Sequence, residues 1–202
     1  MDPGIALDVE DWVSRESHVE RMTKGVLAFL DQHDQKATFF ALGWVAEHFP
    51  DLIREIVRHG HEIACHSYGH PLVYNLTQSE FEHDLTKALD CIEAASGTRT
   101  KIYRAPGFSI TKRCPWAFEI IRKHGIEIDS SVFPARRSHG GFPEAPSVPH
   151  LIETGHGTLL ELPLASCSFA GMKFVFSGGG YFRIIPESQL CRLFKAASQR
   201  GE

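Results

Sequence analysis

The sequence has no long apolar segment and no excess of positive charge. Its 202 residues include 21 Lys and Arg against 25 Asp and Glu, which gives a formal net charge of −4. Proteins that bind nucleic acid or an anionic membrane through charge carry a basic surface, so this balance argues against both partners. No apolar run approaches the roughly 20 residues that a membrane-spanning helix needs. We therefore expect no nucleic-acid partner and no transmembrane segment.

Paired cysteines are also missing. The chain has five cysteines, and none of them stands in a Cys-x-x-Cys pair. Their odd number and scattered positions argue against a disulfide framework, and the missing Cys-x-x-Cys spacing argues against a thiolate zinc site. The opening residues MDPGIALDVEDW do not have the pattern of a signal peptide. Reduced thiols without a leader are typical of a cytoplasmic protein, and that is the location we expect.

Strands and helices alternate along most of the chain. Short apolar runs predict strands at residues 4–9, 37–42, 62–65, 101–105, 126–129 and 159–165. One of the helices between them should begin at a capping box, Thr77 with Glu80, and end at Gly97. No Gly-, Ser- or Pro-rich linker divides the chain, so we expect one domain over residues 1–202. The alternation predicts an α/β fold with a parallel sheet, whose functional residues gather at the carboxyl ends of the strands.

The helix expected at residues 19–33 has an apolar face that should be buried. That face consists of Val19, Met22, Val26, Leu27 and Leu30. Their spacing is that of one helical stripe. Toward the C-terminus the pattern weakens. Residues 134–150 are rich in Gly and Pro and predict a loop, and SGGGYF at 177–182 predicts a tight turn.

Ionisable side chains follow the predicted strands at their carboxyl ends. They are Asp8, Glu10 and Asp11 after the first strand, His66 and His70 after the third, Arg104 after the fourth, and Asp129 after the fifth. One carboxylate and two imidazoles form a site for zinc or another first-row metal, with a position left for water. A second carboxylate beside that water could accept its proton as a general base. Gly69 and Pro71 indicate that the histidine pair lies in a loop rather than a helix.

Three further residues could support such a site. Arg104 could pair with the base carboxylate and keep it ionised. Pro106 and Gly107 fix the following loop, so a backbone N–H there could face a developing oxyanion. Asp129 could cap the turn that follows it, or it could orient a catalytic histidine. The residues alone favour neither role for Asp129.

Four of these segments occur in the order that is typical of a known family. LDVEDW, HSYGH, YRAPGFS and IDSSVF resemble the first four motifs of the polysaccharide deacetylases, carbohydrate esterase family 4, which share the NodB homology domain. SGGGYFRIIP is similar to a subgroup found with exopolysaccharide biosynthesis. The resemblance implies a distorted (β/α) barrel and metal-dependent removal of N-acetyl groups from amino sugars. The substrate would be a glycan, either a polysaccharide or its lipid-linked precursor.

The resemblance also implies a metal site and a base. Asp11, His66 and His70 would bind a divalent metal, with zinc the first choice and Co, Ni, Mn or Fe as alternatives. The base would be the acid that precedes the ligand, which is Glu10. Some relatives have an Asp-x-Asp spacing, which would make Asp8 the base and Glu10 a ligand. Both assignments of the base stay open.

The remaining motifs imply supporting roles and one gap. Arg104 would steady the base, the N–H of Gly107 would help form an oxyanion hole, and Asp129 would tune a general-acid histidine. That histidine belongs to a late strand of the family, yet no histidine follows His156. We therefore expect a barrel that lacks its last βα unit. Loss of a general acid would lower the rate roughly 10²–10⁴-fold.

Two other functions are compatible with the same residues. One is a ring-opening amidase similar to allantoinase, and the other is a non-catalytic carbohydrate-binding relative that lacks the final histidine. Aromatic residues that could stack on sugars are Trp12, Trp44, Phe108, Trp116 and Tyr181. Such stacking favours a glycan. A comparison of acetate release with allantoin turnover would distinguish the deacetylase from the ring-opening amidase.

Overall fold

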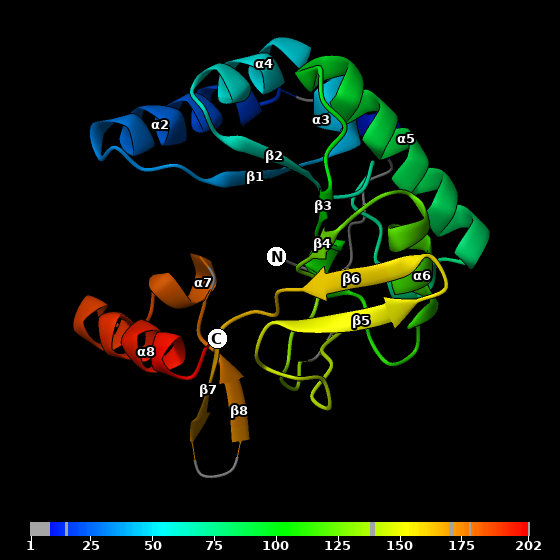
Figure 1. The fold of residues 1–202 in the computed structure, drawn as a ribbon. Helices are drawn as coiled ribbons and strands as arrows, with labels where there is room; N and C mark the ends of the chain where they lie inside the picture. Colours follow the sequence, from blue (N-terminus) through cyan, green and yellow to red (C-terminus); the bar gives the residue numbers. More distant parts are fainter. Residues whose placement is uncertain (1–8, 15, 138–139, 170–171, 178, 202) are drawn as a thin grey trace.

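The structure, a computed structural model, describes residues 9–14, 16–137, 140–169, 172–177 and 179–201. A six-stranded sheet has the order β1-β2-β3-β4-β6-β5, and a two-stranded sheet consists of β7 and β8 (Figure 1). The strands are β1 Thr38–Ala41, β2 Glu62–Cys65, β3 Ile102–Tyr103, β4 Ile128–Asp129, β5 His150–Thr154, β6 Gly157–Glu161, β7 Ser166–Phe169 and β8 Met172–Val175.

The large sheet is mostly parallel. The pairs β1–β2, β2–β3, β3–β4 and β4–β6 run parallel, and only β5 is antiparallel to its neighbour β6. The carboxyl ends of the parallel strands therefore lie along one edge. This confirms the predicted α/β fold with a parallel sheet. The described strands form an open sheet with β1 and β5 at its edges, so closure into a barrel is not seen among them.

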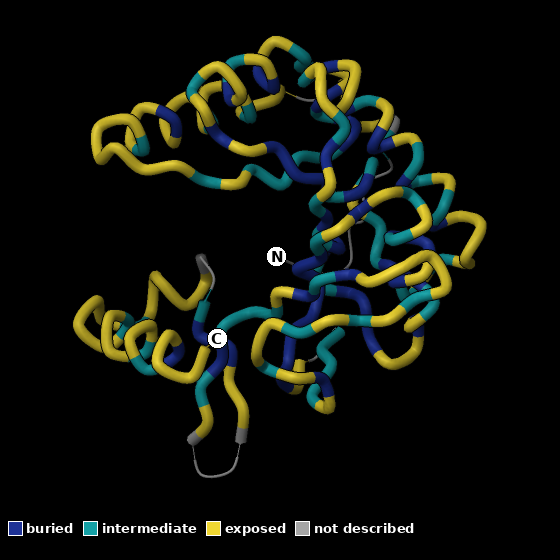
Figure 2. The backbone as a smooth tube through the Cα atoms, viewed as in Figure 1, coloured by how far each residue is buried: buried dark blue, intermediate teal, exposed yellow. Residues whose placement is uncertain are grey.

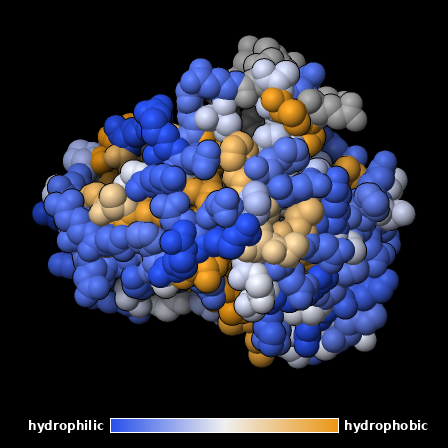
Figure 3. All heavy atoms as spheres, turned by 90° about the horizontal axis from the view of Figure 1, so that it is seen from above, coloured by the Kyte–Doolittle hydropathy of each residue, from blue (hydrophilic) through white to orange (hydrophobic). Residues whose placement is uncertain are grey.

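The helices of the described residues are α1 Val9–Trp12, α2 Val19–Gln32, α3 Gly43–His48, α4 Pro50–Arg58, α5 Gln78–Ser96, α6 Trp116–Lys123, α7 Gly179–Phe182 and α8 Glu187–Gln199. Most of them cover the outer side of the curved sheet (Figure 1). Helices α2 to α6 follow the arc of the sheet, whereas α7 and α8 lie beside the β7–β8 hairpin at its other end. None of the helices in the described ranges has both the length and the apolar character needed to cross a membrane. Figure 3 shows mostly hydrophilic residues on the face seen from above, with small apolar groups between them.

The main core lies between the sheet and helices α3 to α6, and α5 contributes most to it (Figure 2). Its predicted capping box is present, because Glu80 N donates to Thr77 Oγ1 at 3.3 Å and Thr77 N donates to Glu80 Oε2 at 2.7 Å. The helix ends at Gly97, whose φ of 78° is left-handed. The buried residues of this helix are Phe81, Leu85, Ala88, Leu89, Ile92 and Ala95. The sequence prediction of this helix is confirmed.

The apolar face of α2 differs from the prediction. Met22 and Val26 are 60% and 46% exposed, and only Leu27 of the helix is buried. The reason is its position, because α2 lies at the open end of the sheet beside the edge strand β1 (Figure 1). An apolar stripe is buried only where a second layer covers it.

Three local predictions also differ from the structure. Val9, expected in a strand, begins the short helix α1, and residues 4–8 of that predicted strand lie outside the described residues. Residues 179–182 form the helix α7 instead of a turn. Strand β5 begins at His150, the end of the predicted loop, because it pairs with β6 across a tight turn.

Helices α3 and α5 approach closely at a glycine, which permits a stability test. A Cβ on Gly43 would lie 2.6 Å from Ala88 Cα and 2.9 Å from Tyr68 Cδ2. We expect Gly43→Ala to lower the free energy of unfolding by about 1–3 kcal/mol, because the helices must separate. Gly25→Ala in α2 is the control, since nothing lies within 4 Å of a Cβ there. Chemical denaturation should show an unchanged or slightly higher stability for this control, and equal losses at both sites would contradict the prediction.

Candidate active site

The carboxyl ends of four neighbouring parallel strands bring polar residues to one edge of the sheet. His66 follows β2, Arg104 follows β3, Asp129 ends β4, and Glu161 ends β6. Backbone pairing holds these ends in register, because Arg104 N donates to Cys65 O at 3.0 Å and Leu162 N donates to Asp129 O at 2.7 Å. The ionisable residues of the described strands therefore lie together at this edge, as predicted.

His66 is held as a neutral ring with one free lone pair. Its Nδ1 lies 2.6 Å from the carbonyl oxygen of Arg104. A carbonyl can only accept, so Nδ1 carries the proton and Nε2 keeps its lone pair. Burial lowers the pKa of His66 to about 4, so the ring is uncharged near neutral pH. Metal-binding histidines usually have this arrangement, with one ring nitrogen fixed by a hydrogen bond and the other left to bind.

His70 lies beside His66 at a spacing that suits one shared cation. The ring centroids are 5.2 Å apart and the ring planes meet at 73°. Two imidazoles that each bind a tetrahedral Zn²⁺ through one nitrogen would have centroids about 5 Å apart. Burial also lowers the pKa of His70, which favours its neutral, metal-binding form. The chemistry and spacing of this donor pair therefore fit a first-row divalent metal.

The loops around the pair contain left-handed backbone. Among the described non-glycine residues, four have a positive φ, and three of them lie here: Ser67 (71°), His70 (64°) and Phe108 (53°). Each such conformation costs on the order of 1–3 kcal/mol and persists only where the surrounding structure fixes it. The strain therefore marks the two loops as a functional site candidate.

Asp84 of α5 fixes the histidine loop, a role that we did not predict. Ser67 Oγ donates to Asp84 Oδ2 at 2.5 Å, and the backbone N–H groups of Tyr68 and Gly69 donate to its two oxygens at 3.1 and 3.5 Å. A signal was present in the sequence, because Asp84 lies on the apolar face of its helix, three residues after Phe81. An acid on a buried stripe needs partners from another element.

We expect Asp84→Ala to loosen the histidine loop. Loss of these charge-assisted hydrogen bonds should lower the free energy of unfolding by about 1.5–3 kcal/mol. If His66 and His70 bind zinc as predicted, the affinity for zinc should fall about 10–100-fold, the usual effect of removing a residue that positions metal ligands. Denaturation and calorimetric titration with zinc measure the two effects. Asp90→Ala is the control on the same helix, since Asp90 pairs with Arg99 at the surface, and equal zinc affinities in the two variants would contradict the prediction.

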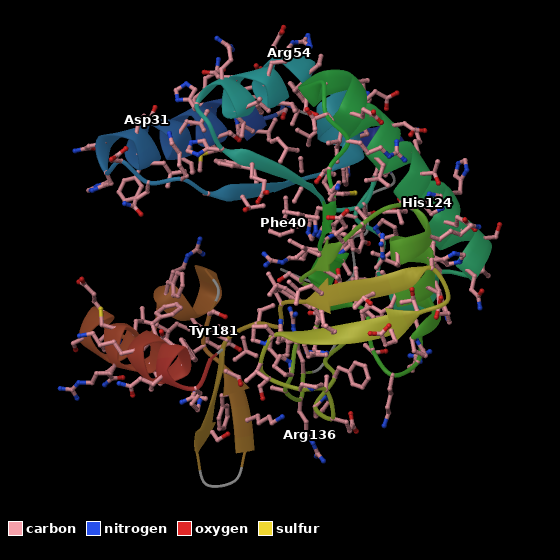
Figure 4. The ribbon with its side chains drawn as sticks, viewed as in Figure 1. Asp31, Phe40, Arg54, His124, Arg136 and Tyr181 are labelled. Carbon is pink, nitrogen blue, oxygen red and sulfur yellow. The ribbon has the colours of Figure 1, made fainter. Side chains whose placement is uncertain are left out.

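Among the described residues, a serine holds the guanidinium of Arg104. Its Nε donates to Ser130 O at 3.0 Å and its Nη2 donates to Ser130 Oγ at 2.8 Å. The guanidinium lies 4.0 Å above the ring of Phe40, which Figure 4 labels. Burial lowers the pKa of Arg104, while the charges of Asp129 and Glu161 raise it. The predicted contact of Arg104 with the base stays a prediction.

The acidic cluster at the start of the chain is described only in part. Asp8 lies outside the described residues, and the side chain of Glu10 does too. Asp11 lies exposed in α1. In the described part of the chain, no three His, Cys, Asp or Glu side chains form a group that could hold one metal ion. The structure therefore brings His66 and His70 together without Asp11, and the ligand and base roles of the three acids stay predictions.

Gly107 occupies a position that only glycine suits. Its φ is 60° within the turn Pro106–Phe108, and a Cβ would lie 2.9 Å from Leu72 Cδ2. Its carbonyl oxygen accepts from Arg137 Nη1 at 3.1 Å, which helps fix the loop. The role of its N–H in an oxyanion hole stays a prediction.

Asp129 is fully buried, and its partners are serines and another acid. Its Oδ1 accepts from Ser131 Oγ at 2.6 Å. The side chain of Glu161, a residue that we did not predict, lies within hydrogen-bond reach of it. No histidine is among its partners in the described ranges. Of the two late histidines, His156 lies in the turn between β5 and β6, and His150 is in register with Glu161. The predicted tuning of a histidine by Asp129 stays a prediction.

Taken together, the fold and the site define an α/β protein with a candidate metal-binding histidine pair at the carboxyl edge of a parallel sheet. The sequence profile described as polysaccharide deacetylase matches residues 3–128, more than half of the chain. The chain belongs to the polysaccharide deacetylase family. A second profile, described as a domain of unknown function, matches residues 130–202.

Several named relatives and solved structures are similar to this chain. A peptidoglycan-N-acetylglucosamine deacetylase from Bacillus cereus is 35% identical over 98 residues, which is 48% of this chain and 36% of that protein. A chitooligosaccharide deacetylase from Azorhizobium caulinodans is 31% identical over 86 residues, 42% of this chain and 41% of that one. The matches therefore span well under two thirds of these relatives.

The solved structures agree with the family assignment. A Mycobacterium smegmatis structure assigned to the polysaccharide deacetylases has a TM-score of 0.62 at 26% identity and covers 88% of this chain and 58% of that one. A family 4 carbohydrate esterase from Streptomyces lividans, in complex with acetate, has a TM-score of 0.50 at 26% identity and covers 56% of each chain. Both likenesses support the NodB-type fold.

Proposed function

We propose that this protein is a metal-dependent hydrolase that removes N-acetyl groups from amino sugars of a polysaccharide or its precursor. The histidine pair carries the proposal, because His66 presents a fixed, neutral ring 5.2 Å from that of His70. The named relatives that act on peptidoglycan N-acetylglucosamine and on chitooligosaccharide support the substrate class. A lipid-linked form of the substrate, a role in exopolysaccharide synthesis and a cytoplasmic location stay predictions.

The metal would be held by His66, His70 and one carboxylate, with Asp11 as the first candidate. A bound divalent metal supplies Lewis-acid polarisation of the acetyl carbonyl and makes water a stronger acid. The chain would provide the remaining chemistry. Glu10 or Asp8 would accept the proton of the attacking water, and the N–H of Gly107 would donate to the developing oxyanion. The left-handed turn at Gly107 and the fixed ring of His66 would orient these groups before the substrate binds.

Acetate release tests the proposal directly. The protein is incubated with N-acetylglucosamine oligomers and with peptidoglycan, first after treatment with a chelator and then after addition of zinc or cobalt. We expect acetate only in the metal-loaded samples. No acetate from any N-acetylated glycan would overturn the proposal. In that case allantoin turnover would identify a ring-opening amidase, and glycan affinity without turnover would identify a carbohydrate-binding relative.

A further inference from the structure

Two buried carboxyl groups meet at the carboxyl ends of β4 and β6. The parallel register places Asp129 directly beside Glu161. Both residues are 0% exposed. Ionised carboxylates so close in a dry environment would repel each other strongly, and each would also have lost its hydration. The pair therefore needs a proton or a cation bound directly to it.

The hydrogen bonds around the pair account for one oxygen of each acid. Ser131 Oγ donates to Asp129 Oδ1 at 2.6 Å, and Val132 N donates to Glu161 Oε1 at 3.0 Å. The other two oxygens, Asp129 Oδ2 and Glu161 Oε2, find no protein donor among the described residues. The two side chains lie within hydrogen-bond reach of each other. One proton between the two carboxyl groups would supply the missing donor.

The electrostatics place that proton on Glu161. Burial, followed by the charge of Asp129, raises the pKa of Glu161 to about 11. Burial also raises the pKa of Asp129, but its hydrogen bonds with Glu161 and Ser131 oppose the shift. Near neutral pH the pair then holds one proton and one negative charge, as do other close carboxyl pairs.

Arg104 is the cation that faces this charge. It follows β3, the strand next to β4, and the negative charge of the pair attracts its guanidinium. Its direct hydrogen bonds go to Ser130 instead, so the pair acts on it through space. The carbonyl oxygen of Arg104 accepts a hydrogen bond from His66 Nδ1, and this bond links the surroundings of the carboxyl pair to the histidine pair. A lost charge at the pair would remove a compensating negative charge from a partly buried guanidinium.

We propose that Glu161 is a positioning residue that keeps a proton against Asp129, so that the two acids present a single negative charge to Arg104. Glu161 comes from the region 130–202, whose profile is described as a domain of unknown function. That region therefore adds β6 to the sheet, and it adds one carboxyl group to the edge where the parallel strands end. The state of the pair does not depend on the proposed deacetylase activity, whereas its effect on turnover rests on that function.

Native electrophoretic mobility near neutral pH tests the shared charge. Glu161→Gln should leave the mobility unchanged, because a neutral amide replaces a neutral acid and can donate to Asp129 Oδ2. Asp129→Asn should shift the mobility by one charge, because burial, the main cause of the raised pKa of Glu161, still keeps Glu161 protonated. The double variant should migrate with one negative charge fewer. Glu153→Gln on the exposed face of β5 is the control, and its mobility should shift by one charge.

A Glu161→Gln variant that shifts like Glu153→Gln would show two ionised acids and overturn the proposal. Infrared spectra supply a second readout that does not need the double variant to fold. The wild-type protein should show the carbonyl band of a protonated carboxyl group, shifted in D₂O, and Glu161→Gln should lack it. No such band in the wild type, or its persistence in Glu161→Gln, would overturn the proposal.

Turnover then tests the consequence for Arg104. If the metal-loaded wild type releases acetate, the folded double variant should do so about 10–100-fold more slowly, the usual effect of a lost positioning interaction. Unchanged turnover would overturn the positioning role. An inactive wild type would overturn the proposed function alone, because the mobility and infrared results would still decide the state of the pair.

Discussion

His66→Ala should lower metal-dependent acetate release by more than about 100-fold and abolish tight zinc binding. The variant removes the ring whose Nδ1 is fixed by the carbonyl of Arg104 and whose Nε2 is free to bind. His70 alone would then supply one imidazole, and a divalent ion that loses one of its two nitrogen ligands binds weakly. Acetate release and calorimetric titration with zinc measure the two effects.

The control for this prediction is His33→Ala, which removes an exposed imidazole at the end of α2. It should leave zinc affinity and acetate release unchanged. Circular dichroism should show that both variants remain folded, so that a loss of activity reports on the site. Zinc affinity of His66→Ala equal to that of the wild type would contradict the metal role of His66.

Local sequence signals predicted the elements whose structure depends on near neighbours. The strand at residues 62–65 has the predicted bounds, and α5 lies between the predicted capping box and Gly97. A capping box and a C-terminal glycine act within one helical turn, so the sequence displays them completely. The predicted burial of the apolar face of α2 was wrong for the opposite reason, because burial depends on which other elements cover the helix.

The same distinction explains which site residues could be predicted. His66 and Arg104 directly follow strands, and the parallel topology brings such positions together. Asp84 and Glu161 are defined by partners far away in the sequence, the loop at residue 67 and the strand ending at Asp129. An acid within an apolar helix face or an apolar strand was the available signal. That signal predicts a buried polar contact without naming its partner.

The C-terminal region was the least predictable. Strand β5 has one sheet neighbour, β6. The hairpin that they form could have been predicted from the short Gly-His turn between two runs of alternating polarity. Helix α7 contains glycines, which disfavour helices in isolation. Packing of aromatic rings supports it instead, because the centroids of Phe182 and Phe194 lie 6.1 Å apart. Such contacts between elements cannot be derived from propensity.

Glu161→Gln should become more stable relative to the wild type as the pH rises. In the folded wild type Glu161 keeps its proton, whereas in the unfolded chain it loses the proton above its ordinary pKa of 4.5. Folding therefore takes up one proton, and the free energy of unfolding falls with rising pH by up to about 1.4 kcal/mol per pH unit. Glutamine has no such proton, so the difference between the two proteins should grow by up to about 4 kcal/mol between pH 5 and 8.

The titratable groups near Glu161 do not remove this difference in the free energy of unfolding. Asp129 stays ionised in the variant, while burial raises the pKa of Tyr103 and Arg104 faces the pair as a cation. His150, in register with Glu161, is present in both proteins. Urea denaturation at several pH values measures the slope, with Glu153→Gln as an exposed control that should show none. Parallel pH profiles for Glu161→Gln and the wild type would mean that Glu161 is ionised in the folded protein, because only a buried proton makes the two profiles diverge.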